Sequence, residues 1–168
     1  MFAGSVAAKD FKYLCLIDDD VTIPEEMNFG VHLMSESVKA ICYPIRAVHP
    51  DTGTDKSWFI QWQGIEYKMA DYAKMIQNQW STVLYPHGAC ALWDRAVLIE
   101  CFREHDTVFF ADDVKMGLWF TRHGYEMRIH VSIKLGTRGY DRVVCIDTHE
   151  CGCRCSITSW WTRMLLRV

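Results

Sequence analysis

Two short acidic stretches contain the residues most capable of chemistry. Asp18, Asp19 and Asp20 directly follow the apolar run 13–17. Three adjacent carboxylates are costly at the end of a buried strand unless a cation or water reaches them. A turn leading into a charged helix N-terminus is the competing interpretation, but it explains the two glutamates that follow better than it explains the triplet. Open α/β sheets bind ligands at the carboxyl ends of their strands, so a ligand or metal role is about as well supported as the turn.

The second stretch is the pair Asp112 and Asp113, which follows two phenylalanines. Taken alone, the pair is best interpreted as the N-cap of a helix. If both acidic stretches face one sheet edge, their charge becomes favourable when they hold a divalent cation that binds a phosphate. Carboxylate oxygens suit Mg²⁺ or Mn²⁺. A carboxylate kept off the metal could accept a proton from a hydroxyl nucleophile.

The elements that must position these carboxylates alternate between strand and helix, which indicates an α/β fold. The hydrophobic pattern predicts, in order, a strand at 13–17, a helix at 24–37, a strand at 38–48, a loop at 49–57, a helix at 58–80, a short strand on each side of the 86–88 turn, a helix from Arg95, a helix after the second acidic pair and a strand from Tyr125. We expect a weak point at Gly30, a bulge or sheet edge at Pro44 and a helix C-cap at Gly124.

Two of these helices carry apolar residues at helical spacing, and we interpret both sets as core. The sets are Ile65, Met69, Tyr72, Met75 and Ile76 in the first helix, and Val114, Leu118 and Trp119 in the second.

The composition is that of one globular domain. The chain has 168 residues, half of them hydrophobic, with a net charge of −3, which gives no reason to expect a nucleic-acid surface. No apolar run reaches the roughly 18 residues that a membrane span needs. Taken alone, the sequence predicts a soluble cytoplasmic protein.

Eight cysteines fall into two groups. Four are single and apolar in context, and we expect buried thiols: Cys15, Cys42, Cys90 and Cys101. The others are Cys145, Cys151, Cys153 and Cys155. A zinc site with His149 is conceivable, but the alternate-residue spacing fits poorly, so thiols without a designed role are preferred.

Four segments, in order over about residues 11–133, resemble family 2 glycosyltransferases, which include chitin, hyaluronan and cellulose synthases. "LCLIDDDVTIP" resembles the family's strand and DxD motif, and "WFIQWQGIEY" looks like a helix of the processive synthases. "VLYPHGACALWDRAVL" is similar to their glycine-centred stretch, and "FFADDVKMGLWFTRHGY" is similar to the segment that carries their catalytic acidic pair.

The resemblance implies a GT-A-like mixed sheet flanked by helices and a metal-dependent, inverting transfer from a nucleotide-diphospho sugar, with UDP as the expected nucleotide, to a glycan acceptor. By the resemblance, Asp18 and Asp20 are the DxD carboxylates and hold Mg²⁺ or Mn²⁺, with Asp18 nearer the nucleotide. Asp113 matches the catalytic base, and Asp112 replaces the usual glutamate. The turn with His87 and Gly88 would lie beside the acceptor or the donor sugar.

The sequence departs from the family in two places. Nothing upstream of residue 11 supplies the family's nucleotide-binding strand, so we expect an incomplete catalytic domain at 1–133. The family's "QxxRW" motif has only "SWWTRM" as a counterpart. Trp160 and Arg163 have suitable residue types for substrate binding, but the glutamine is absent, and an exposed segment is the preferred interpretation. Residues 134–168 are therefore predicted to be an irregular, cysteine-rich tail.

Three hypotheses remain open. The first is a glycosyltransferase of the polysaccharide-synthase type, whose family members associate with the cytoplasmic face of a membrane. The second is a catalytically inactive remnant that only binds partners or metal. The third, ranked last, is a zinc module in the tail.

Overall fold

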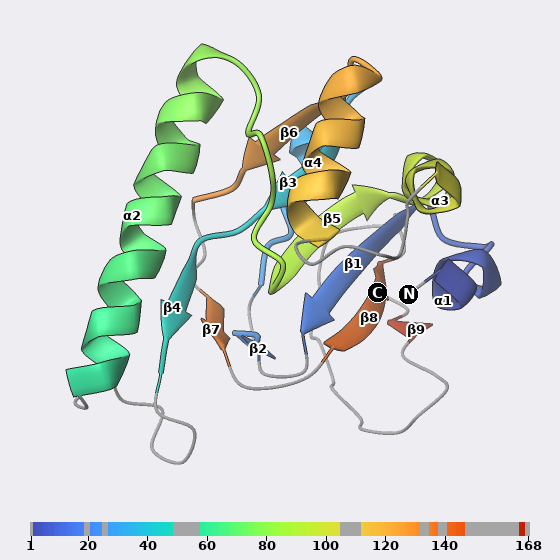
Figure 1. Cartoon of the computed structure of the whole chain (residues 1–168). Helices are drawn as coiled ribbons and strands as arrows, with labels where there is room; N and C mark the ends of the chain where they lie inside the picture. Colours follow the sequence, from blue (N-terminus) through green and yellow to red (C-terminus); the bar gives the residue numbers. More distant parts are fainter. Residues whose placement is uncertain are drawn as a thin grey trace.

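The computed structural model describes residues 2–18, 21–24, 27–48, 58–104, 112–131, 135–137, 141–146 and 165–166. Helices and strands are mixed along this part of the chain (Figure 1), which confirms the predicted α/β class. The elements are α1 (Phe2–Ala7), β1 (Tyr13–Asp18), β2 (Val21–Thr22), the 3₁₀ helix η1 (Val31–Leu33), β3 (Val38–Cys42), β4 (Ile45–Ala47), α2 (Trp58–Trp80), β5 (Cys90–Asp94), α3 (Arg95–Glu104), α4 (Asp112–Arg122), β6 (Glu126–Ile129), β7 (Leu135–Thr137), β8 (Asp141–Ile146) and β9 (Leu165–Leu166). Among these described elements the alternation is less regular than predicted, because α4 follows α3 directly and the strands from β6 to β9 follow one another.

The main sheet is mixed and has the strand order β6-β3-β5-β1-β8-β9. β5 is antiparallel to both of its neighbours: Ile17 pairs with Cys90 on one side, and Cys42 with Ala91 on the other. β6 runs parallel to β3. The carboxyl ends of β1, β3 and β6 therefore meet the beginning of β5 at one edge of the sheet. A second, three-stranded sheet has the order β2-β7-β4.

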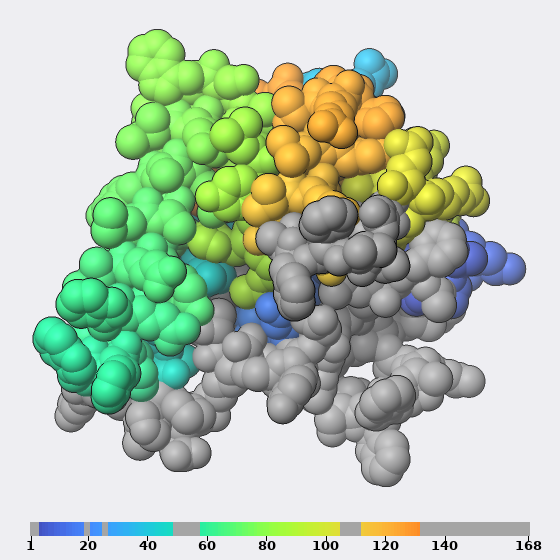
Figure 2. All heavy atoms as spheres, viewed as in Figure 1, coloured from blue at the N-terminus to red at the C-terminus, as the bar shows by residue number. Residues whose placement is uncertain are grey.

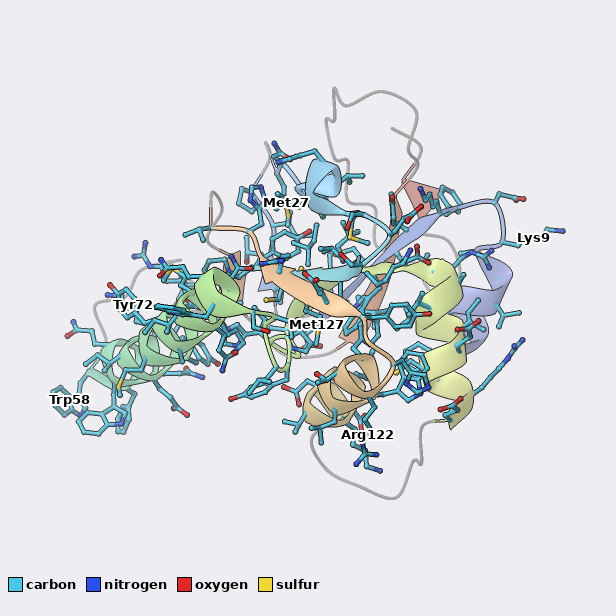
Figure 3. All side chains as sticks on the ribbon, turned by 90° about the horizontal axis from the view of Figure 1, so that it is seen from above. Lys9, Met27, Trp58, Tyr72, Arg122 and Met127 are labelled. Carbon is cyan, nitrogen blue, oxygen red and sulfur yellow. The ribbon has the colours of Figure 1, made fainter. Side chains whose placement is uncertain are left out.

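Each face of the main sheet carries its own hydrophobic core because side chains alternate along every strand. In β1, Leu14 and Leu16 pack with α3, α4 and the residues that follow α1. Cys15 and Ile17 pack on the opposite face with the segment around Met27. Figure 3 shows Met27 on one side of the sheet and α4, which ends at Arg122, on the other. The sheet edge is thus supported from both faces.

The helix predicted at 24–37 is wrong. Within its described residues, only η1 is helical, and a single 3₁₀ turn spans Val31–Leu33. Gly30 lies in the left-handed region with φ +65°, and its N–H donates to Asn28 Oδ1 at 2.8 Å. An Asx-type turn with a left-handed residue interrupts a regular helix, so the weak point expected at Gly30 is a break in the structure.

Two predicted strands differ from the structure. The strand at 38–48 is divided at Tyr43 and Pro44, where the chain leaves the main sheet for the smaller one, so Pro44 lies at a break between two strands and not at a bulge. The strand expected before the 86–88 turn does not form. Val83 donates one backbone hydrogen bond to Met127, and the segment continues as bends. The predicted loop at 49–57 lies outside the described residues.

α2 has the predicted bounds, but its predicted core face is wrong. Of the stripe assigned to the core, four side chains are exposed and only Met75 packs partly against the core: Ile65, Met69, Tyr72 and Ile76 are 56–68% exposed. The buried residues of α2 are Asp71 and Lys74. Figure 3 shows Trp58 pointing away from the rest of the molecule. Periodicity identifies the helix, but the surface it packs on decides which face is buried.

α4 shows a similar shift of face. Val114 and Leu118 are exposed, contrary to the prediction, and Trp119 is partly buried; Met116, Gly117 and Phe120 make the buried contacts. The C-cap predicted at Gly124 is confirmed: its φ is +74°, and the next residue's N–H bonds back to the Phe120 carbonyl at 3.0 Å.

Two further predictions concern the cysteines and the tail. The four single cysteines are buried free thiols, as expected. Within 134–168 the structure describes the strands β7, β8 and β9, of which β8 pairs with β1. The rest of that region, including Cys151, Cys153, Cys155 and His149, lies outside the described residues. The boundary at residue 133 stays a prediction.

Candidate functional site

The carboxyl end of β1 lies beside residues 84–89, the segment that precedes β5 and is called the turn below. Asp18 is the last residue of β1, and its N–H donates to the Ala89 carbonyl at 2.9 Å. The antiparallel register of the two strands requires this, because it pairs Ile17 with Cys90. The backbone of Asp18 therefore lies next to Ala89, and its side chain is half-buried.

The second acidic pair reaches the same turn. α4 begins at Asp112, and the Asp113 carboxylate uses one oxygen locally: Oδ1 accepts the Val114 N–H at 2.9 Å. The other oxygen, Oδ2, lies 3.9 Å from the position that a Cβ would take on Gly88. The structure thus brings Asp18 and Asp113, far apart in sequence, to two adjacent residues of one turn. Asp112 is exposed at the helix start.

The segment between α2 and β5 is packed tightly against α4. A Cβ on Gly117 would lie 2.0 Å from the Leu84 carbonyl oxygen and 2.8 Å from Tyr85 Cα. Only glycine permits that approach. Figure 2 shows the segment that precedes β5 in the space between α2 and α4. Pro86 is fully buried. α4 therefore supports the turn directly, in addition to carrying Asp113.

α2 holds the turn from the other side through polar side chains. His87 Nε2 lies 2.7 Å from Asp71 Oδ1, and both side chains are largely buried. The Lys74 ammonium lies over the Tyr85 ring, 4.7 Å from its centroid. The Tyr67 ring contacts the His87 imidazole edge-on at 6.4 Å between centroids. Three residues of α2 thus engage two residues of the turn.

Two ionisable side chains of this region, Asp71 and Lys74, are buried away from water. Burial lowers the pKa of Lys74, while the carboxylates of Asp71 and Asp113 act in the opposite direction. Burial also raises the pKa of the Cys42 thiol, at the end of β3, to about 12, so this thiol is neutral near pH 7. Lys74 is thus coupled to a carboxylate on its own helix and to one on α4.

Sequence reasoning missed Asp71 and Lys74, although a signal for them was present. Tyr67, Asp71, Lys74 and Asn78 recur at a spacing of three or four residues and so share one face of α2. This polar stripe is the face that packs. Asn78 Oδ1 accepts the Ile129 N–H at 3.2 Å, which ties the same face to β6.

Asp18 is the described carboxylate that could contribute to a cation site at this turn. Mg²⁺ or Mn²⁺ commonly uses one or two protein carboxylates with several waters, so Asp18 alone does not make a complete site. The described part of the chain contains no group of three or more His, Cys, Asp or Glu side chains arranged to hold a metal by themselves. Asp20, Trp160 and Arg163 lie outside the described residues, so their predicted roles stay predictions.

None of the helices in the described ranges combines the length and the apolar character needed to cross a bilayer.

A comparison with protein families identifies the family of this chain. The family model described as "Glycosyltransferase like family 2" matches residues 1–135, and no curated protein matches the chain. The match covers the four segments on which the resemblance was based, as well as α1 through β6. The mixed sheet flanked by helices agrees with the GT-A-like fold expected for such a protein. The chain therefore belongs to the glycosyltransferase family 2-like proteins.

Proposed function

We propose that this chain transfers a sugar, with inversion, from a nucleotide-diphospho sugar to a glycan acceptor, as polysaccharide synthases do. The observation that carries the proposal is the convergence of Asp18 and Asp113 on the turn at Gly88 and Ala89. A strand-end carboxylate beside a half-buried carboxylate on a helix N-terminus is suited to a reaction that needs both a cation site and a base.

Asp113 is the proposed general base. Its Oδ1 is engaged by the Val114 N–H, which fixes the carboxylate and leaves Oδ2 directed toward Gly88. Oδ2 would accept the proton of the acceptor hydroxyl. The hydroxyl oxygen then bonds to the anomeric carbon as the bond to the diphosphate oxygen breaks, and the electron pair leaves with the diphosphate. One displacement of this kind inverts the anomeric centre.

The remaining residues bind and orient. Asp18 and Asp20 are the proposed ligands of Mg²⁺ or Mn²⁺, which when bound neutralises the charge of the diphosphate leaving group. Gly88 is exposed and lacks a side chain, so a sugar could approach the backbone beside Asp113. Asp112 adds negative charge at the start of α4. The His87 imidazole is hydrogen-bonded to Asp71, and this contact fixes its position within the turn.

The test is calorimetric titration of UDP into the protein with and without Mn²⁺. We expect binding that requires the metal and that falls at least tenfold in Asp18→Asn and Asp20→Ala. Asp10→Asn is the matched control, because Asp10 is an exposed aspartate in the turn after α1. Equal binding by all four proteins would refute the metal assignment.

The inactive remnant makes a different prediction from the same titration. A chain that has lost its donor site would bind no nucleotide diphosphate with or without metal, although it would unfold cooperatively in urea. Metal-dependent binding without turnover of any nucleotide sugar would favour a retained but silent site.

A further inference from the structure

The inward face of α2 is polar, whereas its outward face is apolar. Asp71 and Lys74 are 6% and 3% exposed, whereas Met69, two residues before Asp71, is 68% exposed. Burying a lysine and an aspartate is costly unless each finds a partner. The same helix carries many apolar residues, so a shortage of them does not explain a polar interior. We therefore expect the buried Asp71 and Lys74 to do more than pack α2 against the rest of the molecule.

Their partners all lie in the turn that faces Asp113. Asp71 Oδ1 is 2.7 Å from His87 Nε2, and the Lys74 ammonium lies over the Tyr85 ring. Gly88, which faces Asp113 Oδ2, comes directly after His87. On the opposite side, α4 packs against the backbone at Leu84 and Tyr85 through Gly117. The turn is held between two helices, one of which also supplies the proposed base.

Lys74 is the residue on which the charges of this region converge. Asp71, on the same helix, and Asp113, on α4, both act on its ammonium. The Lys74 ammonium also packs over the Tyr85 ring, so its charge acts on both sides of the turn. Removing that charge would take away the cation on which both carboxylates act.

We propose that Lys74 and Asp71 are positioning residues of the transferase, and that with Tyr85 and His87 they form a bracket that fixes Gly88 beside Asp113. The role in transfer rests on the function proposed above. Asp71 and Lys74 are buried behind the turn, so they act on the substrates only through it. Loss of the bracket should therefore disturb the alignment of the acceptor hydroxyl with the base more than it disturbs nucleotide binding.

The experiment compares Lys74→Met, which keeps the aliphatic stem, with Lys74→Arg, which keeps the charge and can stack on Tyr85. Lys68→Met is the matched control, because Lys68 is an exposed lysine on the same helix. Three quantities are measured on the full chain: amide hydrogen exchange of residues 85 and 87–89, the affinity for UDP with Mn²⁺, and kcat for sugar transfer.

For Lys74→Met we expect amide exchange in the turn to rise about tenfold and kcat to fall at least tenfold, with UDP affinity within about threefold of the parent. Lys74→Arg should recover most of both losses, and Lys68→Met should match the parent. Unchanged exchange in Lys74→Met would overturn the bracket. Faster exchange with unchanged kcat would overturn its role in transfer. A parent protein that neither binds UDP nor turns over refutes the transferase instead, and the exchange data still decide whether the bracket exists.

Discussion

Replacing Gly117 by alanine tests the close contact between α4 and the turn. In an exposed helix, Gly→Ala stabilises by about 1 kcal/mol because alanine has the higher helix propensity. Here the new Cβ would lie 2.0 Å from the Leu84 carbonyl oxygen, and real Cβ contacts essentially never fall below 3.0 Å. The two backbones must therefore separate by about 1 Å. The second contact, 2.8 Å to Tyr85 Cα, is also with backbone, so a side-chain rotation cannot relieve it.

Overpacking of this kind costs about 1–3 kcal/mol, and the rigid backbone contacts place Gly117 at the upper end. After the gain in propensity, we expect a net loss of about 2 kcal/mol, or about 4–8 °C in Tm for a domain of this size. The sign is the informative part of the prediction, because propensity alone predicts the opposite change.

Gly64 provides the matched control, since it is also helical and nothing lies within 4 Å of its added Cβ. Gly64→Ala should stabilise the protein by about 0.5–1 kcal/mol. The assay is urea unfolding followed by far-UV circular dichroism for the parent and both variants. If Gly117→Ala were as stable as Gly64→Ala, the packing of α4 on the turn would be wrong, and with it the geometry that places Asp113 beside Gly88.

Three further predictions use other parts of the fold. Burial raises the pKa of Cys42 from 9.0 to about 12, so its contribution to stability is complete below pH 9 and is lost as the pH rises toward 12. Between pH 8 and 10 the parent should lose about 1 kcal/mol relative to Cys42→Ala, and parallel urea midpoints of the two proteins would contradict this. Asp113→Asn should lower kcat about 10²–10⁴-fold with UDP affinity retained, whereas exposed Asp112→Asn should cost less than tenfold; equal losses in initial-rate assays would remove Asp113 as the base. Gly30→Ala should destabilise by at least about 1 kcal/mol, because φ is +65° and the Cβ would lie 2.7 Å from the His130 ring; an unchanged Tm would contradict this.

Local signals predicted the elements well where the chain itself determines them. The buried strand before Asp18, the bounds of α2 and the left-handed cap at Gly124 follow from hydrophobic runs and glycine chemistry within a few residues. The helix predicted at 24–37 failed for a local reason as well. The Asn28 side chain bonds to the Gly30 N–H, and that turn competes with helix formation.

The orientation of α2 could not be predicted in the same way. Hydrophobic periodicity assumes that the apolar stripe faces the core, but α2 packs on β4, on β6 and on the turn that contains His87. The polar groups of that surface need hydrogen-bonding partners: Asp71 bonds to His87, Gln77 accepts the Leu84 N–H, and Asn78 accepts the Ile129 N–H of β6. The polar stripe packs, and the apolar stripe of α2 remains exposed.

The site depends on a non-local pairing that no single stretch of sequence determines. Asp18 and Asp113 become neighbours because β1 and β5 pair antiparallel, which brings the end of one strand to the beginning of the other, and because Gly117 lets α4 approach the same turn. A one-residue slip of β1 against β5 would exchange the two faces of β1 and bury Asp18 on the wrong side. Leu14 and Leu16 prevent that slip, since both belong to the core beneath α3 and α4. The apolar residues that precede the carboxylate thus determine where it lies, and the carboxylate determines what the edge can bind.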